Sequence, residues 1–475
     1  MREQTVFERK PADPALVSRA LAGSRLRSFW LDDLTGAEHH PALTSEVEAD
    51  LAIVGGGYTG LWTALLAARR DPSARIVLLE GRTIGWAASG RNGGFCDASL
   101  THGEENGRRR WPEEYERLAE LGLENLDEIE STLAELSIDC EFERTGSLDV
   151  AIEPHQVAWL LDEPATDGTT LLDEAGVRAE IASPTYLAGA WYRRTTAMLH
   201  PAKLVVGLAR AAAEAGVLIH ERSVVRSITE DGSVPEGRVA LVTDEGTVRA
   251  RRVVLATNAF PSLLRRNRPM TVPVYDYALM TAPLSAEQLA SIGWQHRQGV
   301  SDLGNQFHYY RLSADDRILF GGYDAIYPTG GRMSAGHEDR DRTYRRLASH
   351  FFTTFPQLED VPFTHRWAGA IDTSTRFCAF YGTARRGQVA YATGFTGLGV
   401  GATRFAAQVV LDLLEGASTE RTSLRMVREK PLPFPPEPFA SIGINATRWS
   451  LDQADHRGGR RNALLRTLDA LGLGF

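Results

Sequence analysis

The sequence predicts an α/β protein in which a discontinuous Rossmann-like domain is joined to an α+β domain built on a mixed or antiparallel sheet. Three observations support this fold class. A glycine-rich turn follows an apolar strand near residue 55, further helix–strand units occur near 200–225 and 390–415, and the stretch 270–365 is rich in strand-like and aromatic residues. Because a segment of different character separates these units, the Rossmann-like part is expected to be assembled from separated pieces.

Composition narrows the class of protein. A chain of 475 residues is long enough for two or three domains with a sizeable core. Its hydrophobic content of 43% and charged content of 24% are ordinary for a globular enzyme, and a net charge of −9 argues against binding nucleic acid or anionic lipid. No apolar run is long enough to predict a membrane span, and residues 1–27 lack the apolar core of a signal peptide.

The cysteines favour a reducing compartment. Cys96, Cys140 and Cys378 are odd in number and form no CxxC pair, so we interpret them as small buried side chains and not as a disulfide framework. No His/Cys cluster has metal-ligand spacing, and no metal site is predicted. We therefore expect a cytoplasmic protein.

The most informative motif is the glycine turn after the strand 50–54. Gly55 permits the tight turn, Gly57 lets a pyrophosphate approach the backbone, and Gly60 lets the following helix, 61–69, pack closely on the strand. The N-terminus of that helix presents free N–H groups and a partial positive charge to phosphates. This pattern predicts a phosphate cradle.

An acidic residue follows at the expected distance. Glu80 closes a second strand over 74–79, where its carboxylate can accept hydrogen bonds from the ribose hydroxyls of an adenosine and would repel a 2′-phosphate. Strand, glycines, helix, strand and acid in this order predict dinucleotide binding. The alternative is a glycine-rich turn that binds no ligand.

A second loop of small residues spans 85–94. Its backbone can lie against a flat ring and offer donors to the polar edge of the ring and to a pyrophosphate, with charge from Arg91 and hydrogen bonds from Ser89 and Asn92. Gly93 and Gly94 complete the loop. The alternative is a flexible surface loop.

The remaining elements follow from hydrophobic periodicity. Residues 1–47 are expected to form an irregular arm, of which Ser28-Phe29-Trp30 could pack on the body. The pattern predicts helices over 113–136 and 204–215, strands over 140–150, 217–220 and 252–258, a hairpin turn at Asp231-Gly232, and a glycine turn with a helix over 391–415. The predicted domain map gives 48–100, 196–265 and 366–420 to the nucleotide-binding domain, 101–195 and 266–365 to the substrate domain, and 421–475 to a C-terminal extension.

Three motifs together resemble a known family. The glycine turn, the Ala-Ser-Gly-Arg-Asn-Gly-Gly loop at 88–94 and the Tyr-Ala-Thr-Gly-Phe-Thr-Gly-Leu-Gly turn at 391–399 occur in this order. The sequence thereby resembles the D-amino-acid oxidase/sarcosine oxidase superfamily, and within it the gamma-glutamylputrescine oxidoreductase-like branch, over residues 48–415. The resemblance implies a discontinuous FAD-binding domain, a second domain whose large sheet roofs the flavin, and oxidation of a carbon–nitrogen bond by hydride transfer to the flavin.

The resemblance also assigns cofactor contacts. It places the pyrophosphate at Gly55, Gly57 and Gly60, the ribose at Glu80 and the adenosine side at Arg82. The middle of the cofactor is assigned to Ser89, Arg91, Asn92, Gly93 and Gly94, the adenine to Val225, and a strand end that passes the pyrophosphate to Ala256, Thr257 and Asn258. The flavin pyrimidine is assigned to Gly394, Gly397, Leu398, Gly399 and Val400. Relatives often carry His or Tyr where this chain has Leu398, so contact there is expected through the backbone. A helix N-terminus at this turn would stabilise the negative charge of reduced flavin.

Non-covalent FAD is expected. Some relatives attach the flavin through a cysteine that aligns near Gly369, whereas Cys378 falls several residues later, and others use a histidine near the 88–89 loop, where this chain has none.

The substrate is expected to be the reductant, because the chain has a single complete nucleotide fingerprint. The predicted reaction is oxidation of a small-molecule primary or secondary amine or amino acid to an imine, which hydrolyses to a carbonyl compound. The electron acceptor is oxygen or another compound, since Phe320 aligns with the lysine that activates oxygen in some of these oxidases. Alternatives are an NAD-dependent Rossmann dehydrogenase and a non-catalytic FAD-binding protein.

Candidate substrate residues lie in two aromatic strands. Alternation directs Tyr309 and Arg311 to one face, opposite to their neighbours 308 and 310. Arg311 could clamp a carboxylate, or form a surface or interdomain ion pair. Tyr323 and Asp324 align with catalytic or amine-contacting groups; Asp324 could attract a cationic amine, or cap a turn.

Overall fold

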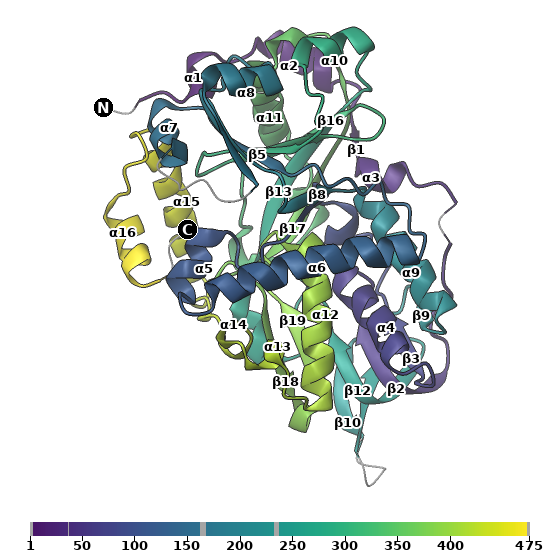
Figure 1. Cartoon of the computed structure of the whole chain (residues 1–475). Coiled ribbons are helices and arrows are strands. Elements are labelled where there is room, and N and C mark those ends of the chain that lie inside the picture. Colours follow the sequence, from purple (N-terminus) through teal and green to yellow (C-terminus); the bar gives the residue numbers. More distant parts are fainter. Residues whose placement is uncertain (1–2, 37, 162–167, 232–236, 473–475) are drawn as a thin grey trace.

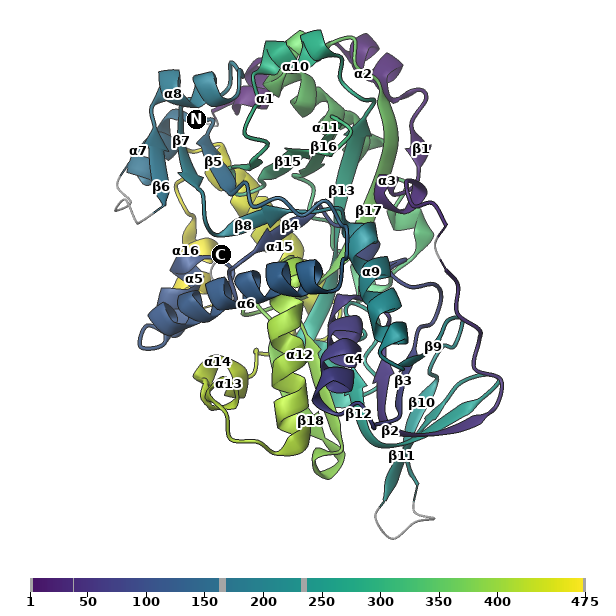
Figure 2. The same ribbon diagram turned by 45° about the vertical axis from the view of Figure 1, so that its right-hand side comes forward.

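Two large sheets organise the computed structural model, which describes residues 3–36, 38–161, 168–231 and 237–472. Figure 1 shows one sheet with its helices in the lower half of the molecule and the other in the upper half, and Figure 2 shows the same division after rotation. The lower sheet has eight strands and the upper has nine. This mixed α/β architecture confirms the predicted fold class.

The eight-stranded sheet is Rossmann-like. Its middle strands run parallel in the order β12-β2-β3-β9, and β19 is also parallel to β12. The antiparallel strands β11 and β10, and β18 beside β19, extend the sheet beyond β12, whereas β9 forms the other edge. Where the sheet is covered on both faces, the middle strands are apolar and buried, over 51–54, 76–79 and 253–255. Its strands are β10 (Ser227–Asp231), β11 (Arg238–Val242), β12 (Thr247–Leu255), β2 (Glu46–Val54), β3 (Ile76–Leu79), β9 (Leu218–His220), β19 (Val389–Thr393) and β18 (Phe380–Ala384).

Helices cover one face of this sheet and share one core with it. They are α4 (Tyr58–Arg70), α9 (Pro201–Glu214), α12 (Gly399–Glu415) and α6 (Tyr115–Glu135), and the short α5 (Glu104–Arg110) precedes α6. Helix α9 begins one residue after His200, whose ring nitrogen accepts a hydrogen bond from the Lys203 N–H, with Pro201 at the first helical position. The expected hairpin is present as β10 and β11, but its turn residue Gly232 lies outside the described residues.

The nine-stranded sheet is mixed and mainly antiparallel. It runs β1-β17-β13-β16-β15-β14-β5-β7-β6, with only the β1–β17 and β14–β5 pairs parallel among the described residues. Its strands are β1 (Arg25–Leu26), β17 (Phe363–Ser374), β13 (Thr271–Thr281), β16 (Ile318–Gly322), β15 (His308–Leu312), β14 (Gly299–Asp302), β5 (Ser147–Ala151), β7 (Ala188–Tyr192) and β6 (Thr169–Leu172). A two-stranded ladder, β4 (Phe95–Asp97) with β8 (Thr196–Met198), lies beside it.

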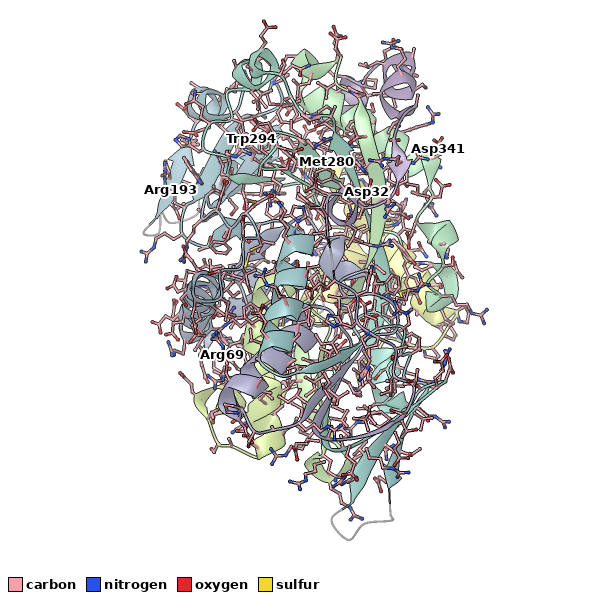
Figure 3. All side chains as sticks on the ribbon, turned by 90° about the vertical axis from the view of Figure 1, so that its right-hand side faces the viewer. Asp32, Arg69, Arg193, Met280, Trp294 and Asp341 are labelled. Atoms are coloured by element: carbon pink, nitrogen blue, oxygen red, sulfur yellow. The ribbon has the colours of Figure 1, made fainter. Side chains whose placement is uncertain are left out.

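The aromatic stretch supplies the core of this half. Helix α11 (Asp341–Thr354) packs on β13. The helices α7 (Pro154–Leu161), α8 (Glu174–Glu180) and α10 (Ala286–Ile292) lie around the periphery of the upper half. In Figure 3, Met280 and Trp294 lie within the packed interior, whereas Arg193 reaches the surface. No helix in the described ranges combines the length and apolar character required to cross a membrane.

Three segments differ from the sequence expectation. The irregular arm is instead helical over α1 (Val6–Arg9), α2 (Pro14–Leu21) and α3 (Phe29–Asp32), short helices whose few apolar residues gave no detectable period. Strand β17 belongs to the nine-stranded sheet throughout, because it pairs with β13 over most of its length. Helix α6, expected in the substrate domain, packs on α12 of the Rossmann-like part.

The C-terminal extension is also helical. It contains α13 (Glu420–Ser423), α14 (Arg425–Arg428), α15 (Phe439–Asp455) and α16 (Ala463–Ala470). Figure 1 shows α15 and α16, in yellow, on the same side of the molecule as α5 and α7. The extension therefore crosses from the Rossmann-like half to the upper half.

Candidate active site

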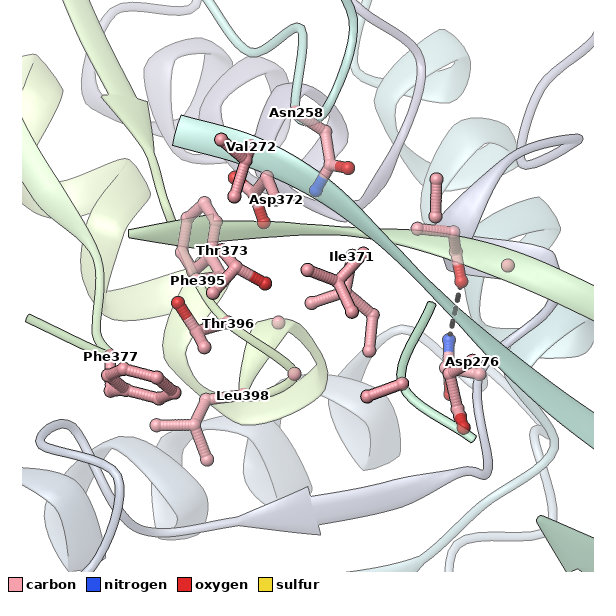
Figure 4. A pocket seen from close by; sticks show the side chains of 18 of the residues that line it. Asn258, Val272, Asp276, Ile371, Asp372, Thr373, Phe377, Phe395, Thr396 and Leu398 are labelled. Atoms are coloured by element: carbon pink, nitrogen blue, oxygen red, sulfur yellow. Dashed lines mark hydrogen bonds between the residues drawn. The ribbon is translucent and has the colours of Figure 1, made fainter. Parts of the chain in front are cut away.

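One large cavity of about 1740 Å³ is lined by residues of both sheets and of the C-terminal extension. Small-molecule sites commonly measure ~300–1,000 Å³, so this cavity has room for a dinucleotide together with a second ligand. Figure 4 looks into it: Asp372, Thr396 and Leu398 gather on one side of Ile371, and Asp276 lies on the other.

The glycine turn has the geometry of a phosphate cradle. Gly55 has a φ of +116°, and a Cβ there would lie 2.3 Å from the Ala256 carbonyl oxygen. A Cβ on Gly60 would lie 1.9 Å from the Gly55 carbonyl oxygen, so the helix and strand approach as closely as their backbones allow. Gly57 lines the cavity immediately before α4, and the first N–H of this helix, that of Tyr58, donates to the Ser89 hydroxyl oxygen at 3.0 Å. A helix N-terminus beside a cavity is the arrangement that binds phosphates in proteins.

Glu80 is a buried carboxylate at the next strand end. It accepts hydrogen bonds from the Gly56 and Arg82 N–H groups, each at 2.8 Å, and from the Trp86 indole at 2.9 Å. A carboxylate offers about four acceptor positions, which leaves capacity for a ribose hydroxyl. The Arg82 guanidinium lies over the Trp86 ring, 4.2 Å from its centre, and also lines the cavity.

The 85–94 loop is not a free surface loop. The Trp30 indole donates to the Asn92 carbonyl at 2.9 Å and Ser28 donates to the Gly90 carbonyl at 2.7 Å, so the N-terminal segment anchors it. Arg91 lines the cavity, but its guanidinium pairs with Glu338 at 2.7 Å, which balances the charge that we expected it to give to a ligand.

The second glycine turn is held by an aspartate that the sequence did not single out. Asp372 accepts hydrogen bonds from the Gly394 N–H at 2.5 Å and the Thr393 hydroxyl at 3.1 Å. Burial raises the pKa of Asp372 to about 6, although these hydrogen bonds oppose the rise. The turn presents Gly397 and the N-terminus of α12 to the cavity.

Most of the predicted cofactor residues line the cavity. They are Gly55, Gly57, Glu80, Arg82, Ser89, Arg91, Asn92, Gly93, Val225, Ala256, Thr257, Asn258, Gly397, Leu398, Gly399 and Val400. Gly60, Gly94 and Gly394 lie just behind this lining, where a Cβ would meet a backbone carbonyl or a packed ring. These three glycines permit close packing.

Two of the four predicted catalytic residues face the cavity. Tyr309 and Tyr323 line it, whereas Arg311 and Asp324 do not. Arg311 is 2% exposed and donates to the carbonyls of Gly94 and Leu199, so it ties the 85–94 loop to the segment before α9. Within the described residues it neither faces the cavity, where it could clamp a carboxylate, nor forms an ion pair. Phe320, aligned with the oxygen-activating lysine, packs in the core.

Asp324 is engaged behind the cavity. Its two oxygens accept from Thr343 and Arg346 of α11, each at 2.8 Å. The side chain is therefore directed away from the cavity, and neither attraction of a substrate amine nor turn capping describes it.

An Asp324→Ala variant tests this position. We expect the free energy of unfolding to fall by about 1–2 kcal/mol, because Thr343 and Arg346 lose their acceptor. Urea unfolding measures this loss, while KM for amines is expected to stay within about twofold. A large rise in KM at unchanged stability would contradict the assignment.

The sequence interpretation missed an acidic group in the cavity. Asp276 of β13 accepts a 2.5 Å hydrogen bond from the Tyr309 hydroxyl, and both residues line the cavity. Its position deep in the protein raises the pKa of Asp276 to about 6, while the hydrogen bond from Tyr309 lowers it. A single carboxylate between apolar and aromatic residues of a strand was the available indication.

This pair adjoins the second loop. A Cβ on Gly93 would lie 2.7 Å from the Tyr309 ring, so the aromatic ring lies directly against the loop backbone. Asp276 of β13 pairs with Gly369 of β17, and a Cβ added to Gly369 would lie 3.7 Å from the Arg91 Cβ. A titratable carboxylate and a phenol thus stand beside the region expected to hold the flavin ring.

Two sheets around one cavity large enough for a dinucleotide, with glycine turns at two helix N-termini, are typical of a dinucleotide-binding protein. The chain belongs to the FAD-dependent oxidoreductase family (DAO), whose pattern it matches over residues 50–413. The glycine turns, the Glu80 carboxylate placed for a ribose, and the lack of side chains at Gly55 and Gly60, where backbones approach each other, fit FAD as the cofactor.

Individual relatives agree with this family. The chain is 30% identical over 399 residues to gamma-glutamylputrescine oxidoreductase of Escherichia coli (strain K12), covering 82% of this chain and 89% of the relative. It is 28% identical over 413 residues to the probable oxidoreductase OrdL of Haemophilus influenzae, covering 84% and 90%. Glycine oxidase of Bacillus cereus shares the fold, with a TM-score of 0.63 at 20% identity, over 80% of this chain and 99% of that one.

Proposed function

We propose that the protein oxidises a carbon–nitrogen single bond of a primary or secondary amine or amino acid. FAD, when bound, accepts the hydride from the substrate carbon, and the resulting imine hydrolyses to a carbonyl compound. The names of the relatives support this reaction class, since they include a gamma-glutamylputrescine oxidoreductase and a glycine oxidase.

The residues around the cavity divide the cofactor contacts among themselves. Gly57 and the N-terminus of α4 would bind the pyrophosphate, Glu80 the adenosine ribose, and Gly397 with the N-terminus of α12 the flavin. We propose non-covalent binding, which is supported by the position of the three cysteines: each is buried and outside the cavity lining. Their free thiols also support the proposed cytoplasmic location.

The Asp276–Tyr309 pair carries the proposal. An ionised Asp276 can accept a hydrogen bond from a substrate amine and so hold it in the cavity, while the Tyr309 hydroxyl keeps the carboxylate oriented. With its pKa raised to about 6, Asp276 is ionised at neutral pH yet able to take a proton from a substrate ammonium group. Deprotonation leaves the nitrogen lone pair free to stabilise the imine as the hydride departs.

Anaerobic mixing tests the reaction. Protein purified with its flavin is mixed without oxygen with a panel of primary amines, secondary amines and amino acids, and the visible flavin absorbance is followed. We expect at least one amine to bleach it, and readmission of oxygen then shows whether oxygen restores the colour. If dithionite bleaches the flavin but none of the panel does, the proposed reaction is wrong.

A further inference from the structure

The outer wall of the cavity comes from outside the matched family region. The match to the family ends at residue 413, and residues between 432 and 468 of the C-terminal extension also line the cavity. The wall is mostly apolar and includes Ile444 and Leu451 of α15 and Leu464 and Leu468 of α16. Arg448 of α15 is the one charged side chain that this wall adds to the lining in the described part of the chain.

Helix α15 is fixed at both ends. Asp455 accepts hydrogen bonds from the backbone and side chain of Asn305, at 3.0 and 2.6 Å, on a loop that also lines the cavity. Just before the helix, Glu437 accepts a 2.5 Å hydrogen bond from the Tyr327 hydroxyl. Arg448 lies seven residues before Asp455, about 10 Å along the helix, so its position over the cavity is set by both anchors.

Arg448 is available for an anion. Over the described ranges no ion pair or side-chain hydrogen bond engages it, although it is half-buried. The acid one helical turn later, Asp452, lies 3.7 Å from His456 instead. The other arginines of the lining have partners: Arg91 pairs with Glu338, Arg109 donates to Asn106, and the Arg82 guanidinium lies over the Trp86 ring.

The cavity is therefore complementary to a substrate with opposite charges at its two ends. Asp276 offers a carboxylate to an amine, and Arg448 offers a guanidinium from the wall formed by α15 and α16, with apolar side chains around it. A guanidinium binds a carboxylate through two parallel hydrogen bonds, which makes a carboxylate a well-matched partner.

We propose that Arg448 and the apolar wall of α15 and α16 bind the end of the substrate opposite the amine. The substrate class is then an amine that carries a carboxylate across an apolar spacer. This inference rests on the proposed amine oxidation, but the binding of the carboxylate itself does not require turnover.

A chain-length series tests the substrate class. The holoenzyme is assayed for anaerobic flavin bleaching with ω-amino carboxylates and with n-alkylamines of the same length. We expect one length of ω-amino carboxylate to be preferred, and Arg448→Met to lower its kcat/KM by roughly 10- to 100-fold through KM, with little effect on the alkylamines. Arg448→Lys is expected to restore part of the preference, and Arg457→Met, an exposed arginine outside the lining, is the matched control.

A binding measurement separates this inference from the reaction. n-Alkyl carboxylates lack the amine and cannot be oxidised, yet they should raise the Tm of the holoenzyme and not that of Arg448→Met. If the holoenzyme shows no preference for carboxylates, or if Arg448→Met keeps that preference and the Tm shift, the inference is overturned. If no amine bleaches the flavin while the Tm shift depends on Arg448, the proposed reaction fails and the carboxylate site stands.

Discussion

A Gly57→Val variant is expected to fold but to be purified without flavin. Gly57 has φ −91° and ψ −175°, which any residue can adopt, so the backbone tolerates the change. The valine side chain would occupy the cavity in front of the first N–H groups of α4, beside Ser89 Oγ, which lies 2.9 Å from the position of its Cβ. We expect FAD binding to weaken on the order of 100-fold or more, about 3 kcal/mol.

The flavin-to-protein absorbance ratio measures this loss, and circular dichroism shows whether the fold is kept. Gly23→Val is the matched control, because an added Cβ at that exposed glycine meets nothing within 4 Å. Retention of the full flavin content by Gly57→Val would place the pyrophosphate elsewhere.

An Asp276→Asn variant is expected to lose about 100-fold or more in kcat/KM, because an amide cannot take a proton from the amine. In the unaltered enzyme kcat/KM should rise with pH through a pKa near 6, as Asp276 ionises. This rise of kcat/KM with pH should be missing in Asp276→Asn. In Tyr309→Phe it should occur at a higher pH, because the variant lacks the hydrogen bond that lowers the pKa of Asp276. Rapid-mixing measurement of flavin bleaching against pH checks both; an unchanged profile would exclude Asp276.

The same substitution has an opposite effect on stability. The folded-state pKa of Asp276 lies at about 6, above its ordinary 3.8, so this group favours folding at low pH and loses that contribution as pH rises from about 4 to about 6. At neutral pH a buried charge remains, and Asp276→Asn removes it. We expect a higher Tm for the variant at neutral pH, with the difference shrinking below pH 6.

Local constraints made the cofactor half predictable. Gly55, Gly60 and Glu80 are specified by a turn and a strand end that are close together in sequence, and each close approach excludes a side chain. The same holds for the second loop, although the counter-ion of Arg91 could not be foreseen, since Glu338 is 247 residues away.

The substrate half depends on long-range register. Asp276 meets Tyr309 only because β16 lies between β13 and β15, and no short motif records that arrangement. At the end of β16 the chain turns with a φ of +66° at Tyr323, which puts this tyrosine in the cavity and Asp324 behind it. The apolar wall of α15 and α16 likewise arises from docking, so composition gave no indication of it.

The placement of the N-terminal segment affects how the chain can be synthesised. Its strand β1 pairs with β17, α2 packs on α11, and Trp30 holds Asn92. Strand β1 and helix α2 therefore reach these partners, β17 and α11, only after about residue 374 has been made. Neither half is complete without the other, so we expect nascent chains and proteolytic fragments to remain dependent on chaperones, and the two halves to acquire their native structure together.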